Sequence, residues 1–556
     1  MNFQFSKMKP LLKVILLAIL RLTTALNPDE ITIFISCNQQ GNGQEYSYNN
    51  NHNNQFKENL RESIYNQSIL ISKDNLINVY FLHEIFDQPG YWTFLNALPY
   101  IMFETNLVKP NTKWIILSED LSSFDLHYLL NSLAKEDHNK PSYFGYPIYD
   151  NDATVVHHFA FFKNPKWFPY PLLASGVAFT IPLIERLAKR VVKVRPKTDF
   201  TIDASHELAL FIYYNGNDNS SGTSTSSTEI DYPQNTSNNE NNSSTGCDCK
   251  NSANKAKNRY HNDIGNFCKA KCEHEDGTAA DHSTTLLTMS KASYFCSKNP
   301  QHLNDKCAVF PNAVNRNNYC KQADRAAIYF AIKTCQTFHN KRIPFIQSTW
   351  GQYAVFKRFF SDVKDSSIPT INTGVPNTDN GHCLKTLTIL KLAYEEIQNL
   401  NLNQNSPNQI QWLFLADDDT LLSVSGVCEI LGCYNHSDYI YLGERYGYRL
   451  HSKDGFNYIT GGGGIVFSLP TVQQILKFCS CPSLSSPDDM ILGACLNRLK
   501  INAIHSPRFH QARPPDYSTE ALDVYKPISF HKFIQLDPLE LYEKWFRGMD
   551  ENLLIT

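Results

Sequence analysis

The stretch Trp412-Leu413-Phe414-Leu415-Ala416-Asp417-Asp418-Asp419 joins an apolar run to three consecutive carboxylates. It predicts a buried strand that ends in an acidic triplet. Adjacent carboxylates at a buried strand end are strongly destabilising unless a cation or a partner neutralises them. Because Mg²⁺ and Mn²⁺ prefer oxygen ligands and bridge carboxylates to diphosphates, the triplet predicts a metal–diphosphate site of the sugar-nucleotide transferase kind. The alternative is a solvated, helix-capping turn.

Strand and helix patterns alternate around this stretch. Residues 326–334 predict a buried strand, and residues 382–399 have the apolar spacing of a helix that leads into the strand before Asp417. Such alternation predicts an α/β fold with a mostly parallel sheet. Ligands in these folds bind at the carboxyl ends of the strands, where the triplet lies.

Length and composition predict more than one domain. A chain of 556 residues is longer than a single domain with one hydrophobic core usually is. Its net charge of −3 gives no reason to expect a nucleic acid or an anionic membrane as partner. Residues 215–300 are expected to be a low-complexity, cysteine-containing insertion or linker, with local disulfides favoured over zinc. The expected domains on either side are residues 27–214 and 301–556.

The N-terminus predicts entry into the secretory pathway. Residues 1–25 are expected to be a signal peptide, because lysines precede an apolar run, residues 14–20, that is shorter than the roughly 20 residues of a membrane span. A short signal-anchor is the alternative, and only then is membrane attachment expected. The chain also has 15 cysteines and glycosylation sequons, for example at Asn66. We expect a glycoprotein of the endoplasmic reticulum lumen, with the Golgi as the alternative, although the C-terminus carries no recognisable retention signal.

Four sequence blocks occur twice in the same order, which predicts an internal duplication of a domain of about 200 residues. The paired blocks are 113–121 and 411–419, 143–147 and 441–448, 172–180 and 458–468, and 202–210 and 486–493. Aligned through Trp114 and Trp412, the third aspartate, Asp419, falls opposite Leu121. Because a leucine cannot replace a ligating carboxylate, we expect the first copy to be non-catalytic.

Two other differences separate the copies: the run Gly461–Gly464 is reduced to Ser175-Gly176, and Asp488-Asp489 becomes His206-Glu207. Glycines before an apolar segment let the backbone approach a ligand closely, the alternative being a flexible turn. Asp488 is expected to stabilise a helix start. Asp489 is the candidate general base that removes a proton from an attacking sugar hydroxyl.

Residues 325–545 resemble the Fringe-like β-1,3-glycosyltransferases. The resemblance is carried by Arg342–Gly351, the acidic triplet, the glycine run, Pro487-Asp488-Asp489-Met490 and His531. Within that family, residues 442–448, 458–464 and 505–514 are similar to the members that extend O-linked fucose on thrombospondin type 1 repeats with glucose.

This resemblance implies a GT-A fold, a Rossmann-like mixed sheet flanked by helices, in two tandem copies with the first degenerate. It also implies UDP-glucose as the donor and Mn²⁺ (or Mg²⁺) held by Asp419 and His531. Asp489 is implied as the base, and the family's His-x-His segment is absent, so His510 is the second choice for the metal ligand. The residues expected to contact the nucleotide sugar or metal-bound water are Asp417, Asp418, Gly462, Gly463, Glu444 and Arg445.

The sequence therefore predicts an inverting, metal-dependent hexosyltransferase: a β-1,3-glucosyltransferase that acts on fucosylated thrombospondin-repeat proteins. Two alternatives remain open. One is a related β-1,3-glycosyltransferase that uses UDP-GlcNAc or UDP-Gal. The other is a non-catalytic sugar-binding quality-control protein.

Overall fold

The structure is a computed structural model, in which the described residues up to Tyr213 and from Met289 onward pack together. The predicted signal peptide and most of the predicted insertion lie outside the described residues. The described ranges are 26–37, 50–150, 168–194, 199–213, 289–298, 306–312, 320–378, 381–403, 409–533 and 535–554. We call residues 26–312 the N-terminal half and residues 320–554 the C-terminal half.

The C-terminal half is built on a seven-stranded mixed sheet. Four neighbouring strands are parallel, the fifth is antiparallel to both of its neighbours, and the last two are parallel to each other. In spatial order the strands are β14 (Thr370–Asn372), β13 (Phe356–Ser361), β12 (Ile328–Lys333), β15 (Trp412–Asp417), β20 (Ile465–Ser468), β17 (Tyr441–Gly443) and β21 (Ile504–His505). The acidic triplet begins at the last residue of β15, at the carboxyl end predicted from the sequence.

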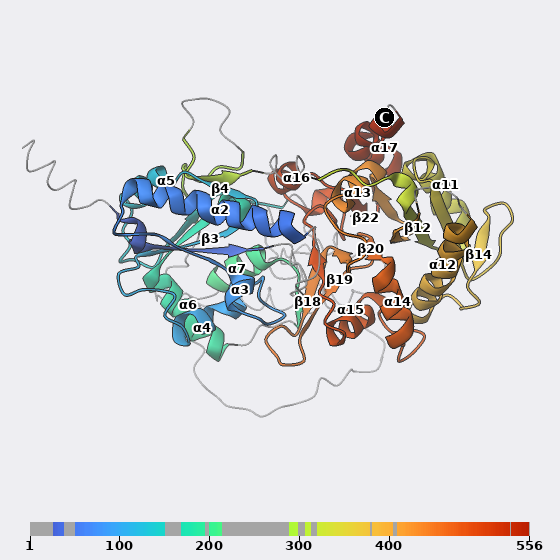
Figure 1. Ribbon diagram of the computed structural model, residues 1–556, viewed down its shortest axis with the longest axis horizontal. Coiled ribbons are helices and arrows are strands. Elements are labelled where there is room, and N and C mark those ends of the chain that lie inside the picture. The colour runs from blue at the N-terminus through green and yellow to red at the C-terminus, as the bar shows by residue number, and fades with distance from the viewer. Residues whose placement is uncertain are drawn as a thin grey trace, which may run out of the picture. The chain divides into compact units, whose positions relative to one another are not determined.

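Helices cover both faces of this sheet (Figure 1). The helices of one face are α11 (His339–Ser348) and α13 (Val424–Leu431), and those of the other are α12 (Cys383–Asn403), α14 (Leu469–Phe478) and α15 (Asp488–Arg498). The predicted helix at 382–399 is therefore α12, and the predicted strand at 326–334 is β12. Strand β12 begins two residues after the predicted start, because Asp324 accepts a hydrogen bond from Ala326 N and caps a short 3₁₀ turn there.

The N-terminal half contains a six-stranded sheet whose strand order and directions match those of β13 to β21. In the corresponding order its strands are β2 (Asn78–Phe81), β1 (Ile31–Ser36), β3 (Trp114–Glu119), β8 (Val177–Thr180), β5 (Tyr143–Gly145) and β10 (Ser290–Lys291). Helices α2 (Asn50–Ile71) and α5 (Leu126–Leu133) lie on one face, and α4 (Phe94–Phe103) and α6 (Ile181–Lys193) on the other (Figure 1). Trp114 and Trp412 hold equivalent places in their sheets, as the sequence alignment assumed.

Short antiparallel ladders extend both halves beyond their central strands. Strand β16 (Thr420–Leu422) pairs with β22 (Ser529–His531), and β4 (Ser122–Phe124) pairs with β11 (Val309–Pro311). The remaining strands and α-helices among the described residues are α3 (Leu82–Ile85), β6 (Pro147–Ile148), β7 (Tyr170–Pro171), β9 (Phe200–Thr201), α7 (Ala204–Tyr213), β18 (Arg445–Tyr448), β19 (Phe456–Ile459), α16 (Thr519–Tyr525), α17 (Pro538–Tyr542) and α18 (Gly548–Glu551).

Strand pairing bears on the domain boundary expected at residue 301. Strand β10 pairs with β5, and β11 pairs with β4, so the segment that follows the insertion completes the N-terminal half. Phe295 and Val309 are buried in the core of that half. The sequence could not show this, because strand pairing across an insertion is set by non-local contacts rather than by local pattern.

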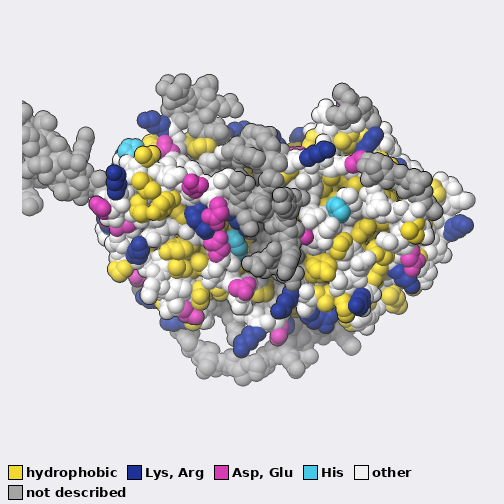
Figure 2. All heavy atoms as spheres, in the orientation of Figure 1, with side chains coloured by type: hydrophobic (Ala, Val, Ile, Leu, Met, Phe, Trp, Pro, Cys, Tyr) yellow, Lys and Arg dark blue, Asp and Glu magenta, His cyan; other side chains and the backbone are white. Residues whose placement is uncertain are grey.

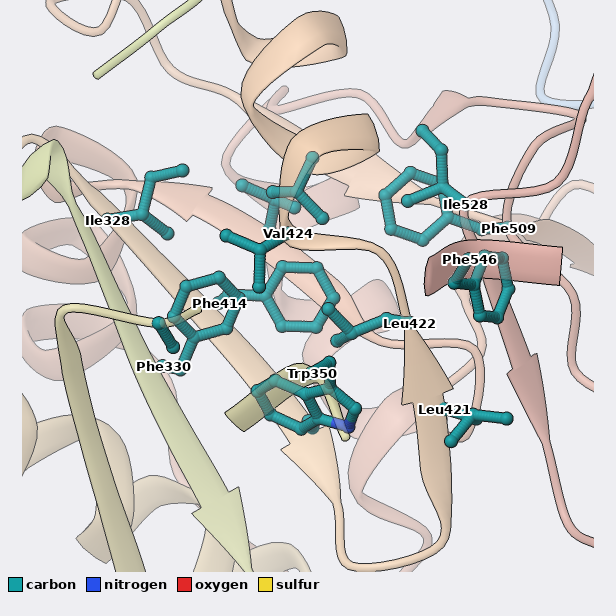
Figure 3. Close-up of a cluster of buried hydrophobic side chains, with 14 of the residues drawn as sticks. Ile328, Phe330, Trp350, Phe414, Leu421, Leu422, Val424, Phe509, Ile528 and Phe546 are labelled. Carbon is teal, nitrogen blue, oxygen red and sulfur yellow. The ribbon is translucent and has the colours of Figure 1, made fainter. Parts of the chain in front are cut away.

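An aromatic cluster supports the turn that carries the acidic triplet (Figure 3). The ring of Phe330 lies 5.5 Å from Trp350 and 5.3 Å from Phe414, centroid to centroid. Trp350 is fully buried, and its indole N–H donates to the carbonyl oxygen of Thr420, 3.1 Å away. Because Thr420 follows Asp419 directly, packing of the core fixes the backbone at the site.

No helix among the described residues combines the length and apolarity needed to span a bilayer. On the face shown in Figure 2, basic and acidic side chains are interspersed rather than gathered by sign.

Candidate active site

Three side chains converge where β15 ends. Since β16 pairs with β22 and places Thr420 opposite His531, the neighbouring Asp419 comes beside the imidazole. His531 Nε2 lies 3.1 Å from Asp419 Oδ1 and 3.8 Å from Asp417 Oδ2. One ligand atom from each of the three residues lies within 4.8 Å of the others. The two carboxylates suit Mn²⁺ or Mg²⁺, and the imidazole nitrogen suits Mn²⁺ better than the harder Mg²⁺. The structure thus brings together Asp419 and His531, the two predicted ligands, and adds Asp417, which was expected to contact the nucleotide.

The glycine run makes room for the imidazole. A Cβ atom on Gly462 would lie 2.1 Å from His531 Nδ1, so only glycine fits there. Gly464 has φ +92°, and a Cβ atom there would lie 2.4 Å from the Phe414 ring. The run was expected to let the backbone approach a ligand. In this structure the run makes room for His531 and passes over the aromatic core.

Gln511 connects the glycine run to His531. The amide oxygen Oε1 accepts from Gly462 N at 2.9 Å and from Gly463 N at 3.3 Å. The main-chain carbonyl of Gln511 lies 3.1 Å from His531 Nδ1. A proton held on Nδ1 by this carbonyl leaves the lone pair of Nε2 directed to the two aspartates, the arrangement found in histidines that bind metals.

Glu444 holds Gln511 in place, because its carboxylate accepts a hydrogen bond from the main-chain N–H of Gln511. The expected nucleotide contacts Glu444, Gly462 and Gly463 therefore belong to the network that holds His531. Sequence reasoning gave Gln511 no role. The only signal was its place directly after His510, where the family's histidine pair is interrupted.

Asp418 points away from the three ligands. It accepts from Thr334 Oγ1 at 2.7 Å and from Arg342 at 2.6 Å, and Arg342 also lies 3.1 Å from Asp419. Burial, together with the charge of Asp419, raises the pKa of Asp418 to about 6. Burial opposes ionisation of Asp419 too, but His531 and Arg342 hold the pKa of that carboxyl well below its usual range. Arg342 thus pairs with the oxygen of Asp419 that faces away from His531.

Lys333, which the sequence did not single out as functional, joins the acidic triplet to helix α15. Its ammonium lies 3.0 Å from Asp417 and 2.7 Å from Asp488, and Thr386 donates to Asp488 at 2.6 Å. Burial alone would raise the pKa of Asp488, but Lys333 holds it low, at about 2. Asp488 stands at the helix start as expected, and it also anchors that helix to β12.

Asp489, the candidate base, follows in the first turn of α15. Its carboxylate accepts from Met490 N at 2.8 Å, and the Gly461 N–H also reaches it. Burial and the adjacent charge of Asp488 raise the pKa of Asp489 to about 7. A partly buried carboxylate with a pKa near neutrality is suited to remove a proton from a hydroxyl group.

Two predicted residues lie elsewhere. His510 packs against Tyr517 and Phe530, and its Nδ1 lies 3.2 Å from the Arg508 carbonyl oxygen, outside the group of three ligands. Arg445 was expected to bind the nucleotide sugar. It is directed instead to the N-terminal half, where it donates to the Tyr91 hydroxyl at 2.9 Å.

The equivalent place in the N-terminal half has different chemistry. The strand registers put Ser36 at the position of Lys333, and Pro311 at the position of His531. With Leu121 opposite Asp419, three of the groups described above are replaced. Glu119, opposite Asp417, accepts a hydrogen bond from the Tyr525 hydroxyl at 2.7 Å. Among the residues that the structure describes, the one candidate metal cluster is that of the C-terminal half.

Comparison with known proteins agrees with this geometry. The model of the family described as Fringe-like matches residues 323–551, which include every residue of the site. The chain belongs to the Fringe-like β-1,3-glycosyltransferases and is a hexosyltransferase.

Two β-1,3-glucosyltransferases are similar over more of the chain than the family model matches. A β-1,3-glucosyltransferase of Mus musculus is 35% identical over 496 residues, which cover 89% of this chain and 84% of that protein. The Homo sapiens protein of the same name is 34% identical over 89% of this chain and 82% of its own length. The β-1,3-N-acetylglucosaminyltransferase lunatic fringe of Xenopus laevis is 24% identical over 33% of this chain and 53% of its own.

Proposed function

We propose that this protein is an inverting, metal-dependent β-1,3-glucosyltransferase that transfers glucose from UDP-glucose to O-linked fucose on thrombospondin type 1 repeats. The observation that carries the proposal is the group formed by Asp417, Asp419 and His531, which Lys333 joins to the helix start that carries Asp489. The similarity to two β-1,3-glucosyltransferases over 89% of the chain supports glucose as the transferred sugar. The acceptor follows from the resemblance in residues 442–448, 458–464 and 505–514.

Each group has one task in this reaction. Asp417, Asp419 and His531 would hold Mn²⁺ or Mg²⁺, which when bound neutralises the diphosphate as it leaves. The Asp489 carboxylate takes the proton of the acceptor 3-hydroxyl. That oxygen then forms a bond to the anomeric carbon of glucose as the bond to the UDP oxygen breaks on the opposite face. Attack opposite the leaving group inverts the anomeric configuration.

We further propose that both halves are GT-A domains and that the N-terminal half is a degenerate copy. The matched strand order and directions support a common origin. The replacement of Asp419 by Leu121 and of His531 by Pro311 supports the loss of a metal site there.

We place the protein in the secretory pathway, in the endoplasmic reticulum lumen, with residues 1–25 as the signal. Four disulfides join described cysteines, which suits an oxidising compartment.

A transfer assay tests the activity. The purified protein is incubated with a fucosylated thrombospondin repeat, one UDP-sugar at a time, and either Mn²⁺ or EDTA. We expect transfer from UDP-glucose, loss of transfer in EDTA and its return with Mn²⁺. Transfer from UDP-GlcNAc or UDP-Gal in place of UDP-glucose would support the alternative that the similarity to lunatic fringe keeps open. Transfer from no donor would support the sugar-binding alternative.

A further inference from the structure

The segment from Glu444 to Gly464 has both of its ends at the metal centre. Glu444 accepts the N–H of Gln511 at one end, and Gly462 lies against the His531 ring at the other. Between these ends, β18 and β19 form an antiparallel hairpin in which Arg445 pairs with Ile459. A displacement of this hairpin therefore moves both groups that hold the imidazole.

The hairpin is attached to the N-terminal half along its length. Trp92 donates its indole N–H to Asn457 of β19 at 2.9 Å. Strand β9 extends the hairpin, with Thr201 paired to Gly447. At the far end Asp199 accepts from Arg449, through the main-chain N–H at 2.6 Å and through Nε at 3.0 Å.

Arg445 is the contact nearest to the metal centre. Only 2% of its surface is exposed, and its guanidinium lies 4.4 Å from the centroid of the Trp92 ring as well as 2.9 Å from the Tyr91 hydroxyl. Among the described residues, its Nε has no hydrogen-bond partner. A buried cation is strongly destabilising unless it is compensated, and aromatic faces attract a guanidinium. The N-terminal half thus supplies the groups that make Arg445 stable in this position.

We propose that the N-terminal half is a positioning domain for the metal centre of the C-terminal half. Tyr91 and Trp92 hold Arg445, which keeps the adjacent Glu444 against Gln511, and Gln511 in turn orients His531. This proposal rests on the proposed metal site. It assigns a structural task to the N-terminal half, in which the residues equivalent to Asp419 and His531 are not metal ligands. Tyr91 and Trp92 are positioning residues, since they contact no ligand atom of the centre.

The test measures Mn²⁺ affinity directly, in the full-length protein, by calorimetry and by the electron paramagnetic resonance of free Mn²⁺. Loss of a group that orients a metal-binding histidine lowers affinity by about 10- to 100-fold. Gln511→Ala keeps the main-chain groups that contact Glu444 and His531 and removes the side-chain contacts to Gly462, Gly463 and His531. We therefore expect about threefold or more weaker binding for Gln511→Ala, Tyr91→Phe and Trp92→Ala. Trp92→Phe, which keeps an aromatic face for Arg445, should recover part of the affinity and serves as the folded variant if Trp92→Ala does not fold.

The matched control is Tyr525→Phe, which removes another hydroxyl hydrogen bond between the halves, one whose acceptor is Glu119 of the N-terminal half rather than a hairpin residue. It should bind Mn²⁺ as the wild type does. Wild-type affinity in Tyr91→Phe and in the Trp92 variants would overturn the proposal, as would an equal loss in Tyr525→Phe. The proposed metal site is tested separately by His531→Ala: if that variant binds Mn²⁺ normally, the proposed function itself fails.

Discussion

At the scale of single residues, the site depends on what surrounds each carboxylate. Three adjacent aspartates receive three different environments: Asp417 faces Lys333, Asp418 faces Arg342 and Thr334, and Asp419 faces His531 and Arg342. These partners stabilise the three carboxylates, but they do not neutralise all of the negative charge of the triplet. The oxygens of Asp417 and Asp419 that face His531 remain the ones suited to a cation.

Asp489 provides a test of the base assignment. We expect Asp489→Asn to lower kcat by about 100-fold or more, because general base catalysis contributes on that order. The variant should be no less stable than the wild type at pH 8, because the wild type holds a poorly solvated charge there. Steady-state kinetics and thermal unfolding at pH 8 check both statements. Full turnover with unchanged substrate binding would rule out Asp489 as the base.

The pH dependence follows from the same carboxylate. Its pKa is raised to about 7, so the deprotonated base forms as the pH rises through that value. We expect kcat/KM to increase from pH 6 to pH 8 with an apparent pKa near 7. Stability changes with pH in the opposite direction from activity. Because the folded state holds the proton of Asp489 more tightly than the unfolded state does, the contribution of Asp489 to stability is lost as the pH rises toward 7. A flat kcat/KM profile between pH 6 and 8 would contradict the assignment.

The glycine run provides a matched pair of substitutions. In Gly462→Ala the new methyl group collides with the His531 ring, so we expect Mn²⁺ affinity to fall by about tenfold or more. In Gly461→Ala the new Cβ atom has no neighbour within 4 Å, so Mn²⁺ affinity should stay near that of the wild type. Calorimetric titration of both variants measures the difference. Equal affinities would show that the imidazole can bind metal from another position.

At the scale of elements, helix α15, which carries the proposed base Asp489, is held at its start and in its later turns. Its start is anchored through Asp488 to Lys333, and the disulfide between Cys479 and Cys495 ties its later turns to the end of α14. These cross-links keep the first turn, which carries Asp489, beside the end of β15.

Removing the disulfide with Cys479→Ser and Cys495→Ser together should lower the free energy of unfolding. The closed loop spans 16 residues, for which chain entropy predicts a loss of about 3 kcal/mol. Denaturant unfolding under non-reducing conditions gives the value. The first turn of α15 should become more mobile, so amide hydrogen exchange at Met490 should be faster than in the wild type. Wild-type stability and exchange would show that packing alone holds the helix.

At the scale of the whole molecule, metal binding in one half should stabilise the folded chain. A ligand that binds the folded state raises its stability by about 2.7 kcal/mol at 100 times its dissociation constant. We expect Mn²⁺ to raise the melting temperature of the wild type and to leave that of His531→Ala unchanged. Differential scanning calorimetry with and without Mn²⁺ decides this. A shift of equal size in His531→Ala would place the stabilising ion at another site.

Local sequence pattern was enough to predict the central strand, its acidic end, the helix at α12, and the equivalence of Trp114 and Trp412. These features depend on local pattern: apolar runs, helical spacing, and a repeat that could be aligned without gaps around the strand. The replacement of Asp419 by Leu121 was visible for the same reason.

The other features of the site became apparent from the folded structure. It put Pro311 in the place of His531, paired residues 309–311 with the N-terminal half, and turned Arg445 toward Tyr91. It also assigned Lys333 and Gln511 to the site, although each is far from its partners along the chain. The physical reason is that a ligand set depends on which strand ends meet and which side chains neutralise one another, and those contacts are made between distant parts of the chain.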